Sequence, residues 1–180
     1  MSYIECMVLG LISQGYRYGH ELDKVIEERN LRLWSKITRV SLYQALIRLK
    51  KKGWVATTTE REGKAPERNV YTLTESGRAA LVKMVSESLA SNEPMEFLIS
   101  IPVSFLYLLP SDQAIAQLEK RQKTVAQILG KIPVVQEDDH FGRKANVKLI
   151  GGYYQMELQW LEWLISELKG NGESERKGLK

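Results

Sequence analysis

Apolar side chains recur at helical spacing in three segments before residue 54, a pattern that predicts amphipathic helices. The segments span residues 2–13, 18–29 and 39–52. Gly15 follows the first segment and Gly53 follows the third, where a glycine commonly ends a helix. Thr38 precedes the third segment and is expected to cap it with its hydroxyl. The pattern therefore predicts three short helices joined by turns.

The third helix, residues 39–52, has one apolar face and one polar, basic face. At helical pitch, Val40, Gln44 and Lys51 project away from the apolar stripe, and Ser41 and Arg48 flank this outer face. Hydroxyl, amide and guanidinium groups on an exposed helix face suit a DNA major groove. An ordinary surface helix with a basic end has the same pattern, so this segment alone leaves both interpretations open. The apolar stripe consists of Leu42, Ala45, Leu46 and Leu49.

Two runs of aromatic and β-branched residues follow this helix, over residues 54–60 and 70–73. The segment REGKAPERN lies between them and predicts a turn through Gly63 and Pro66. Two strands joined by a basic loop, directly after such a helix, are typical of the wing of a winged helix-turn-helix domain. Thr74 is then expected to cap a further helix that runs to about Ser91.

The remainder of the chain predicts a separate helical domain. Asn92 to Pro94 interrupts the helical pattern, so we expect domains over residues 1–91 and 92–170, and a flexible tail over 171–180. The last predicted helix, residues 145–168, has two adjacent apolar stripes. They exceed what one small domain can cover, which favours a homodimer through this half. The expected interface residues are Leu149, Tyr153, Tyr154, Leu158, Trp160, Leu161 and Ile165.

Three blocks of the sequence resemble the PadR-type family of transcriptional regulators. They are VLGLISQGYRYGHEL, SLYQALIRLKKKGWV and VYTLTESGRAAL, which keep the family's order and spacing over residues 3–85. The wing tip, GKAPER, departs from the family's commoner Gly-Arg-Pro run. The closing YYQMELQWLEWL is similar to the family's final helix. The resemblance implies a mainly α fold with a small two-stranded β-wing (α+β), and a helical dimerisation domain.

The same resemblance implies a function. Members of this family bind double-stranded DNA as dimers, so two winged helices would address the half-sites of a near-palindromic operator. They are often released by aromatic or other apolar small molecules, and Trp160 and Trp163 would then border an effector pocket at the dimer interface. The expected function is thus a repressor released by a small-molecule effector. A winged-helix module used only for protein–protein contact is the alternative, and packing of the tryptophans in a core is the alternative to the pocket.

The charge distribution agrees with a polyanion as partner. The net charge is +4, with a pI near 9.1, and the segment from Lys36 to Arg68 holds nine basic and three acidic side chains. Such clustering is the electrostatic footprint of nucleic-acid binding, although a solvated charged face produces it too. We expect Ser41, Gln44 and Arg48 to read bases. Tyr43 is expected either to pack or to contact a phosphate. The expected phosphate contacts are Lys36, Arg39, Lys51, Lys64 and Arg68.

Other classes of function find little support in the sequence. Cys6 is the only cysteine, which excludes an internal disulfide and favours a reduced, cytoplasmic setting. Glu5 interrupts the first apolar run, unlike a signal peptide, and the apolar run over residues 97–109 is too short to span a membrane. His20 and His140 are the only histidines, and HExxH, CxxC and glycine-rich phosphate-loop motifs are missing. We therefore expect no enzyme activity, cofactor or metal.

Overall fold

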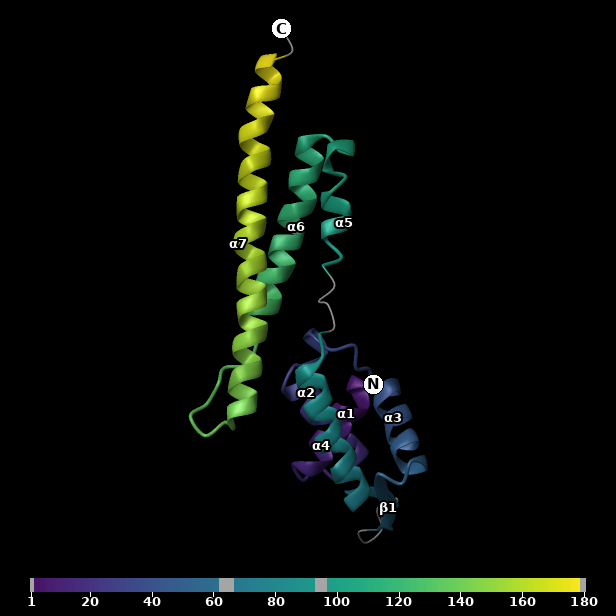
Figure 1. Ribbon diagram of the computed structural model, residues 1–180. Coiled ribbons are helices and arrows are strands. Elements are labelled where there is room, and N and C mark those ends of the chain that lie inside the picture. Colours follow the sequence, from purple (N-terminus) through teal and green to yellow (C-terminus); the bar gives the residue numbers. More distant parts are fainter. Residues whose placement is uncertain (1, 62–66, 93–96, 179–180) are drawn as a thin grey trace. The chain divides into compact units, whose positions relative to one another are not determined.

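The computed structural model describes residues 2–61, 67–92 and 97–178, and the side chains of these residues up to 170. The chain divides into two compact units, Met1–Glu93 and Pro94–Lys180. Each unit has its own apolar core. Figure 1 shows the elements of both units. Within the described residues, no helix is both long enough and apolar enough to cross a membrane.

The N-terminal unit begins with the predicted helices. They are α1 (Tyr3–Ser13), α2 (Gly19–Glu28) and α3 (Arg39–Lys51), with a short 3-10 turn η1 (Leu31–Leu33) between the last two. Gly15 and Gly53 have φ angles of 101° and 71°, a left-handed conformation that stops α1 and α3 at low steric cost. Ser2 caps α1 by accepting a hydrogen bond from the Glu5 amide. The predicted helix boundaries are confirmed to within two residues.

A two-stranded antiparallel sheet forms the wing. It consists of β1 (Val55–Glu60) and β2 (Arg68–Leu73), with Val55 opposite Leu73 and Glu60 opposite Arg68. The Tyr71 amide donates a hydrogen bond to the Arg17 carbonyl over 2.8 Å, which attaches β2 to the turn before α2. The predicted fold class, mainly helical with a two-stranded wing, is confirmed.

The helix α4 (Glu75–Ala90) closes the N-terminal unit against α1. Thr74 caps α4 through the Gly77 amide and also donates a hydrogen bond to the Gly53 carbonyl over 2.8 Å. Gly77 lies against the backbone just before β1. A Cβ atom at this position would be 1.9 Å from the Trp54 carbonyl oxygen, so only glycine fits there. The end of α3, the start of β1 and the start of α4 are therefore joined at one point.

The C-terminal unit is built on two long helices. The elements are α5 (Ser100–Val103), the 3-10 turn η2 (Leu106–Leu108), α6 (Ser111–Leu129) and α7 (Phe141–Gly178). Figure 1 shows α6 and α7 lying side by side. The last helix begins four residues before its predicted start and continues beyond its predicted end. It also runs through Gly151 and Gly152, which have open space around them.

The core between α6 and α7 changes the interpretation of the final helix. Leu161 is fully buried and Ile165 is nearly fully buried. Both residues pack with Leu118 and Val125 of α6. These two residues, which the sequence placed at a subunit interface, are covered within their own chain. Glu157 is also buried, and its carboxylate accepts a hydrogen bond from the Arg121 Nε over 2.8 Å. The helix therefore has a partner in its own unit for one of its two stripes.

Candidate nucleic-acid interface

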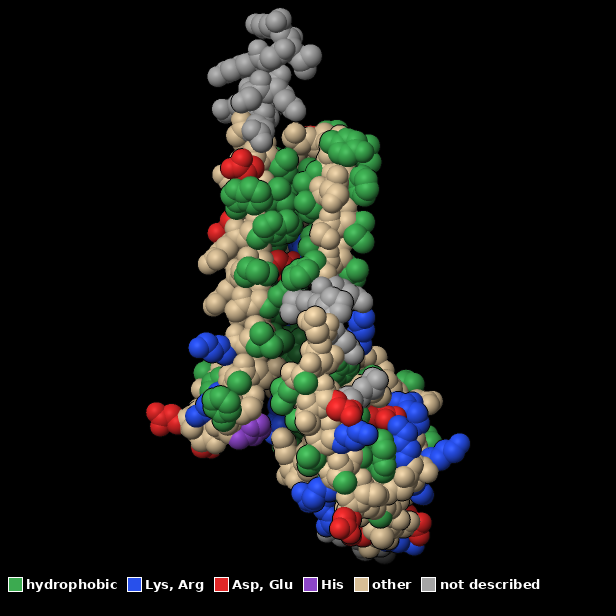
Figure 2. Space-filling view, in the orientation of Figure 1, with side chains coloured by type: hydrophobic (Ala, Val, Ile, Leu, Met, Phe, Trp, Pro, Cys, Tyr) green, Lys and Arg blue, Asp and Glu red, His purple; other side chains and the backbone are tan. Residues whose placement is uncertain are grey.

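The helix α3 has the two faces that its sequence predicts. Leu42, Ala45, Leu46 and Leu49 are buried in the core of the N-terminal unit. On the opposite side Gln44 and Lys51 are exposed, and Val40 keeps 71% of its surface in solvent. Packing in the core therefore fixes the orientation of α3 about its own axis, and the polar face of the helix stays exposed to water. Figure 2 shows Lys and Arg side chains, together with acidic ones, on the visible face of this unit.

The first turn of α3 is fixed by a reciprocal cap. The Ser41 amide donates to the Thr38 Oγ1 over 3.1 Å, and the Thr38 amide donates to the Ser41 Oγ over 2.8 Å. The Ser41 hydroxyl also donates to the Thr38 carbonyl over 3.0 Å. The sequence suggested Ser41 as a base reader. Its hydroxyl instead forms hydrogen bonds that cap the N-terminus of α3. A base contact from this hydroxyl would have to share or break those bonds.

Tyr43 packs across the start of α2. A Cβ atom at Gly19 would lie 2.9 Å from the Tyr43 ring, so only glycine leaves room for the ring in this position. The side chain nevertheless keeps about a third of its surface in water. The close contact with Gly19 supports the expectation that Tyr43 packs within the unit. Because part of the ring is exposed, a phosphate contact by its hydroxyl stays a prediction.

Arg48 is held by an acid that the sequence analysis did not assign to the site. The Arg48 Nε donates to a carboxylate oxygen of Glu5 over 2.9 Å, and the Lys52 Nζ donates to the other oxygen over 2.6 Å. Glu5 is only 4% exposed. Burial by itself raises the pKa of this carboxyl, but the hydrogen bonds and charges of Lys52 and Arg48 outweigh burial and lower its pKa. A lone carboxylate in an apolar helix was the only signal in the sequence.

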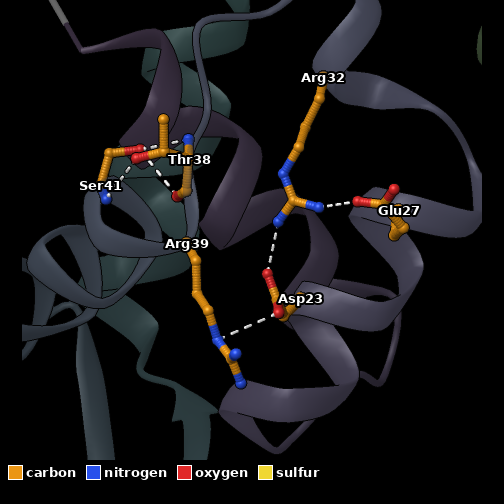
Figure 3. A network of polar contacts seen from close by, with 6 residues as sticks. All are labelled: Asp23, Glu27, Arg32, Thr38, Arg39 and Ser41. Atoms are coloured by element: carbon orange, nitrogen blue, oxygen red, sulfur yellow. Dashed lines mark hydrogen bonds and ion pairs between the residues drawn. The ribbon is translucent and has the colours of Figure 1, made fainter.

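Arg39, at the other end of α3, also meets an acid. Its Nε lies 3.3 Å from the Asp23 Oδ2, and the Asp23 Oδ1 accepts a hydrogen bond from the Arg32 Nη2 over 2.5 Å. Arg32 pairs in turn with Glu27. Figure 3 shows this chain of four charged side chains from α2, η1 and α3 beside the cap of α3. Arg39 remains largely exposed, so its terminal nitrogens face water.

A second polar cluster lies at the end of β1 and the start of β2, next to the loop of the wing. The Tyr18 hydroxyl donates to the Glu60 carboxylate over 2.8 Å, and this hydrogen bond raises the pKa of Tyr18. Arg17 pairs with the same carboxylate over 3.4 Å. Arg68, one of the expected phosphate contacts, is exposed beside this cluster, and Lys36 is also exposed. Lys64, the expected contact at the wing tip, lies outside the described residues.

The geometry agrees with comparisons to known proteins. The family model described as "Transcriptional regulator PadR-like family" matches residues 8–83, from within α1 to within α4. This range includes α2, α3 and both strands of the wing, but not Glu5. Over residues 8–83 the chain matches the PadR-like family. The family regulates transcription and is not a family of enzymes.

Individual relatives of this PadR-like protein extend the likeness to the C-terminal unit. The negative transcriptional regulator PadR of Bacillus subtilis is 25% identical over 134 residues, covering 72% of this chain and 73% of the relative. A crystal structure of B. subtilis PadR in complex with operator DNA matches with a TM-score of 0.74 at 19% identity. It covers 93% of this chain and 98% of that one. The B. subtilis complex with p-coumaric acid has a TM-score of 0.67 at 20% identity, covering 92% and 98%. These likenesses show a shared fold.

The tryptophans of the PadR-like protein's last helix differ in their surroundings. Trp160 packs partly into the core between α6 and α7, whereas Trp163 is 57% exposed. Nearby, burial raises the pKa of the Tyr153 and Tyr154 hydroxyls, and the two rings meet edge to face with centroids 5.1 Å apart. Leu149 is 63% exposed. The expected interface and pocket residues therefore divide between the core of the unit and its surface.

Proposed function

We propose that this PadR-like regulator is a repressor that binds a near-palindromic operator as a homodimer and is released from it by a small-molecule effector. The observation that carries the proposal is α3, whose apolar stripe is fully buried while its polar face is exposed. Such a helix can enter a major groove without disturbing its own core. The relative bound to operator DNA has the same fold, which supports this use of the helix.

The proposed contacts follow from the side chains that remain available. Gln44 is exposed on the outer face of α3 and is the proposed base reader, because an amide can pair with adenine at two atoms. Lys36, Arg39, Lys51 and Arg68 are exposed cations, and we assign them to phosphates. Tyr43 adds a hydroxyl near the same surface. Ser41 and Arg48 keep secondary roles, since both already have partners within the chain.

Exposed apolar side chains of the C-terminal unit support the homodimer. The segment over residues 97–109 exposes Phe97, Ile101 and Tyr107, and α7 exposes Leu149 and Trp163. A second copy is the natural cover for such surface, and it would bring two winged helices to the two half-sites of the proposed operator. Of the interface expected from the sequence, the proposal keeps Leu149, Tyr153, Tyr154, Leu158 and Trp160.

The effector is proposed to be an aromatic acid that binds beside Trp160 and Trp163. Support comes from the relative crystallised with p-coumaric acid and from the aromatic side chains gathered on this part of α7. Binding there would favour one spacing of the two DNA-binding domains over another and so lower the population competent for DNA. We expect p-coumaric acid to release the protein from its operator and to quench tryptophan fluorescence.

Duplex selection followed by fluorescence anisotropy tests the proposal. The full chain should enrich a near-palindrome with half-sites about one helical turn apart. Binding to random duplex should weaken steeply as salt rises, because released counterions drive phosphate binding. Selection without any enriched sequence, or binding that ignores salt, would overturn the DNA-binding proposal and favour a protein–protein module. An operator complex that resists millimolar p-coumaric acid would overturn the choice of effector.

A further inference from the structure

The acid beside Arg39 has no obvious place on a surface that binds a polyanion. We propose that Asp23 is a positioning residue for DNA recognition, which holds the Nε of Arg39 so that the two terminal guanidinium nitrogens take a phosphate of the operator. This inference rests on the proposed function and deepens it, because it concerns how one contact of α3 is prepared before DNA arrives.

Asp23 joins a partly buried arginine, Arg32, to an exposed one, Arg39. Its Oδ1 accepts the Arg32 Nη2 over 2.5 Å, while its Oδ2 lies 3.3 Å from the Arg39 Nε. The Asp23 side chain is 20% exposed, whereas that of Arg39 is 70% exposed. Arg32 thus anchors Asp23 on α2, and Asp23 forms an ion pair with Arg39 through its Nε, as Figure 3 shows.

The position of Arg39 suits a phosphate contact. It is the first residue of α3, and the N-terminal end of a recognition helix is the end that approaches DNA. The reciprocal cap between Thr38 and Ser41 fixes the backbone at this turn. The cap fixes the backbone of Arg39, and the ion pair with Asp23 orients its Nε. The two terminal nitrogens of the guanidinium then point outward together. Two parallel N–H groups of this kind can bind two oxygens of one phosphate.

The surrounding charges explain how an acid can be tolerated there. Arg32 neutralises Asp23, and Glu27 pairs with the other side of Arg32. Two acids and two bases leave the cluster neutral. An Asp23→Asn change therefore does two opposite things: it adds one positive charge to the surface, and it releases Arg39 from its orientation. Binding to random duplex depends mainly on the first effect, because non-specific complexes depend on charge. Binding to the operator depends on both, because only the docked register of the operator complex places one phosphate opposite the oriented guanidinium.

The test compares Asp23→Asn with Glu27→Gln in the full chain. Both variants remove one negative charge from the same cluster, but Glu27 does not touch Arg39. Affinities for the selected operator and for random duplex are measured at one salt concentration. We expect Glu27→Gln to change both affinities alike. Asp23→Asn should lower the operator-to-random ratio by up to about fivefold, the scale of an exposed ion pair.

A double-mutant cycle with Arg39→Ala separates positioning from general destabilisation. In the Arg39→Ala background, Asp23→Asn should no longer change the operator-to-random ratio. Thermal unfolding of each variant reports stability, and Arg39→Ala alters only an exposed side chain, so it keeps the test valid if Asp23→Asn unfolds. The inference is overturned if Asp23→Asn matches Glu27→Gln, or if Arg39→Ala leaves the ratio unchanged. Failure of the unaltered protein to bind the selected operator would instead overturn the proposed function.

Discussion

We expect Glu5→Ala to destabilise the N-terminal unit, because it leaves Arg48 and Lys52 without their shared partner. A hydrogen bond to a charged group contributes about 1.5–3 kcal/mol to stability. Two such bonds are lost, but the Arg48 and Lys52 side chains are 45% and 42% exposed, so water replaces part of each. A net loss of about 2 kcal/mol therefore follows, below the roughly 3–5 kcal/mol that breaking a fully buried pair costs.

Hydrogen exchange followed by mass spectrometry is the suitable assay, since tryptophans occur in both units and would mix their signals. Peptides from α1 and α3 should exchange faster in Glu5→Ala, while peptides from α6 should not change. Glu5→Leu serves as the control, because it restores apolar volume and lets both cations turn to water. It should recover much of the stability. An α1 that exchanges at the unaltered rate in Glu5→Ala would refute the energetic role of this carboxylate.

The same carboxylate predicts a dependence on pH. Its pKa in the folded protein lies below the ordinary value of 4.5, so its contribution is fully present above that value. It is lost as the pH falls through the lowered pKa, where the folded state must take up a proton. The stability difference between the unaltered protein and Glu5→Ala should thus shrink below about pH 4.5. A difference that stays constant from pH 7 to pH 3 would contradict the pairing.

Three further experiments test other parts of the structure. Gly77→Ala should lower the free energy of unfolding in urea by about 1–3 kcal/mol, because the new Cβ would meet the Trp54 carbonyl. Gly10→Ala is the control: a Cβ at Gly10 has open space around it, so this change should be neutral or stabilising. Equal effects would refute that close approach. Unlike the oriented guanidinium proposed for Arg39, a lysine acts as a point charge, so Lys51→Ala should weaken operator and random duplex alike and lower the salt slope by about one. A selective loss on the operator would refute this point-charge role of Lys51. Leu149→Asp should produce folded monomers in sedimentation, whereas Leu161→Asp should unfold the C-terminal unit, and a stable Leu149→Asp dimer would move the interface elsewhere.

Local patterns predicted much of the fold. Helical spacing located α1, α2 and α3, and Thr38, Thr74 and Gly53 marked helix ends because capping and left-handed turns depend on neighbouring residues. The buried stripe of α3 also follows from spacing alone. The first turn of α7 was missed because His140, rather than a more usual cap residue, accepts a hydrogen bond from the Arg143 amide there.

The sequence could not show which side chains already have partners. Glu5 and Arg48 are 43 positions apart, and Asp23 meets Arg39 only because η1 returns the chain to the start of α3. Arg48 was therefore expected to read bases without a partner inside the chain, whereas its Nε donates to Glu5 of α1. The two stripes of α7 were likewise equivalent in the sequence, and only packing against α6 shows which of them is covered.

Periodicity, capping residues and clustered charge are local properties, and by themselves they determined the winged helix-turn-helix, the exposed face of α3 and its basic character. Ion pairs and core contacts between distant segments depend on how the chain folds back on itself, so only the tertiary structure decided that Asp23 meets Arg39, that Glu5 holds Arg48, and that Leu161 lies inside its own unit. The physical reason is that a charged or apolar side chain interacts with whichever partner the fold brings within a few ångströms. The spacing of two residues along the chain does not determine their distance in space.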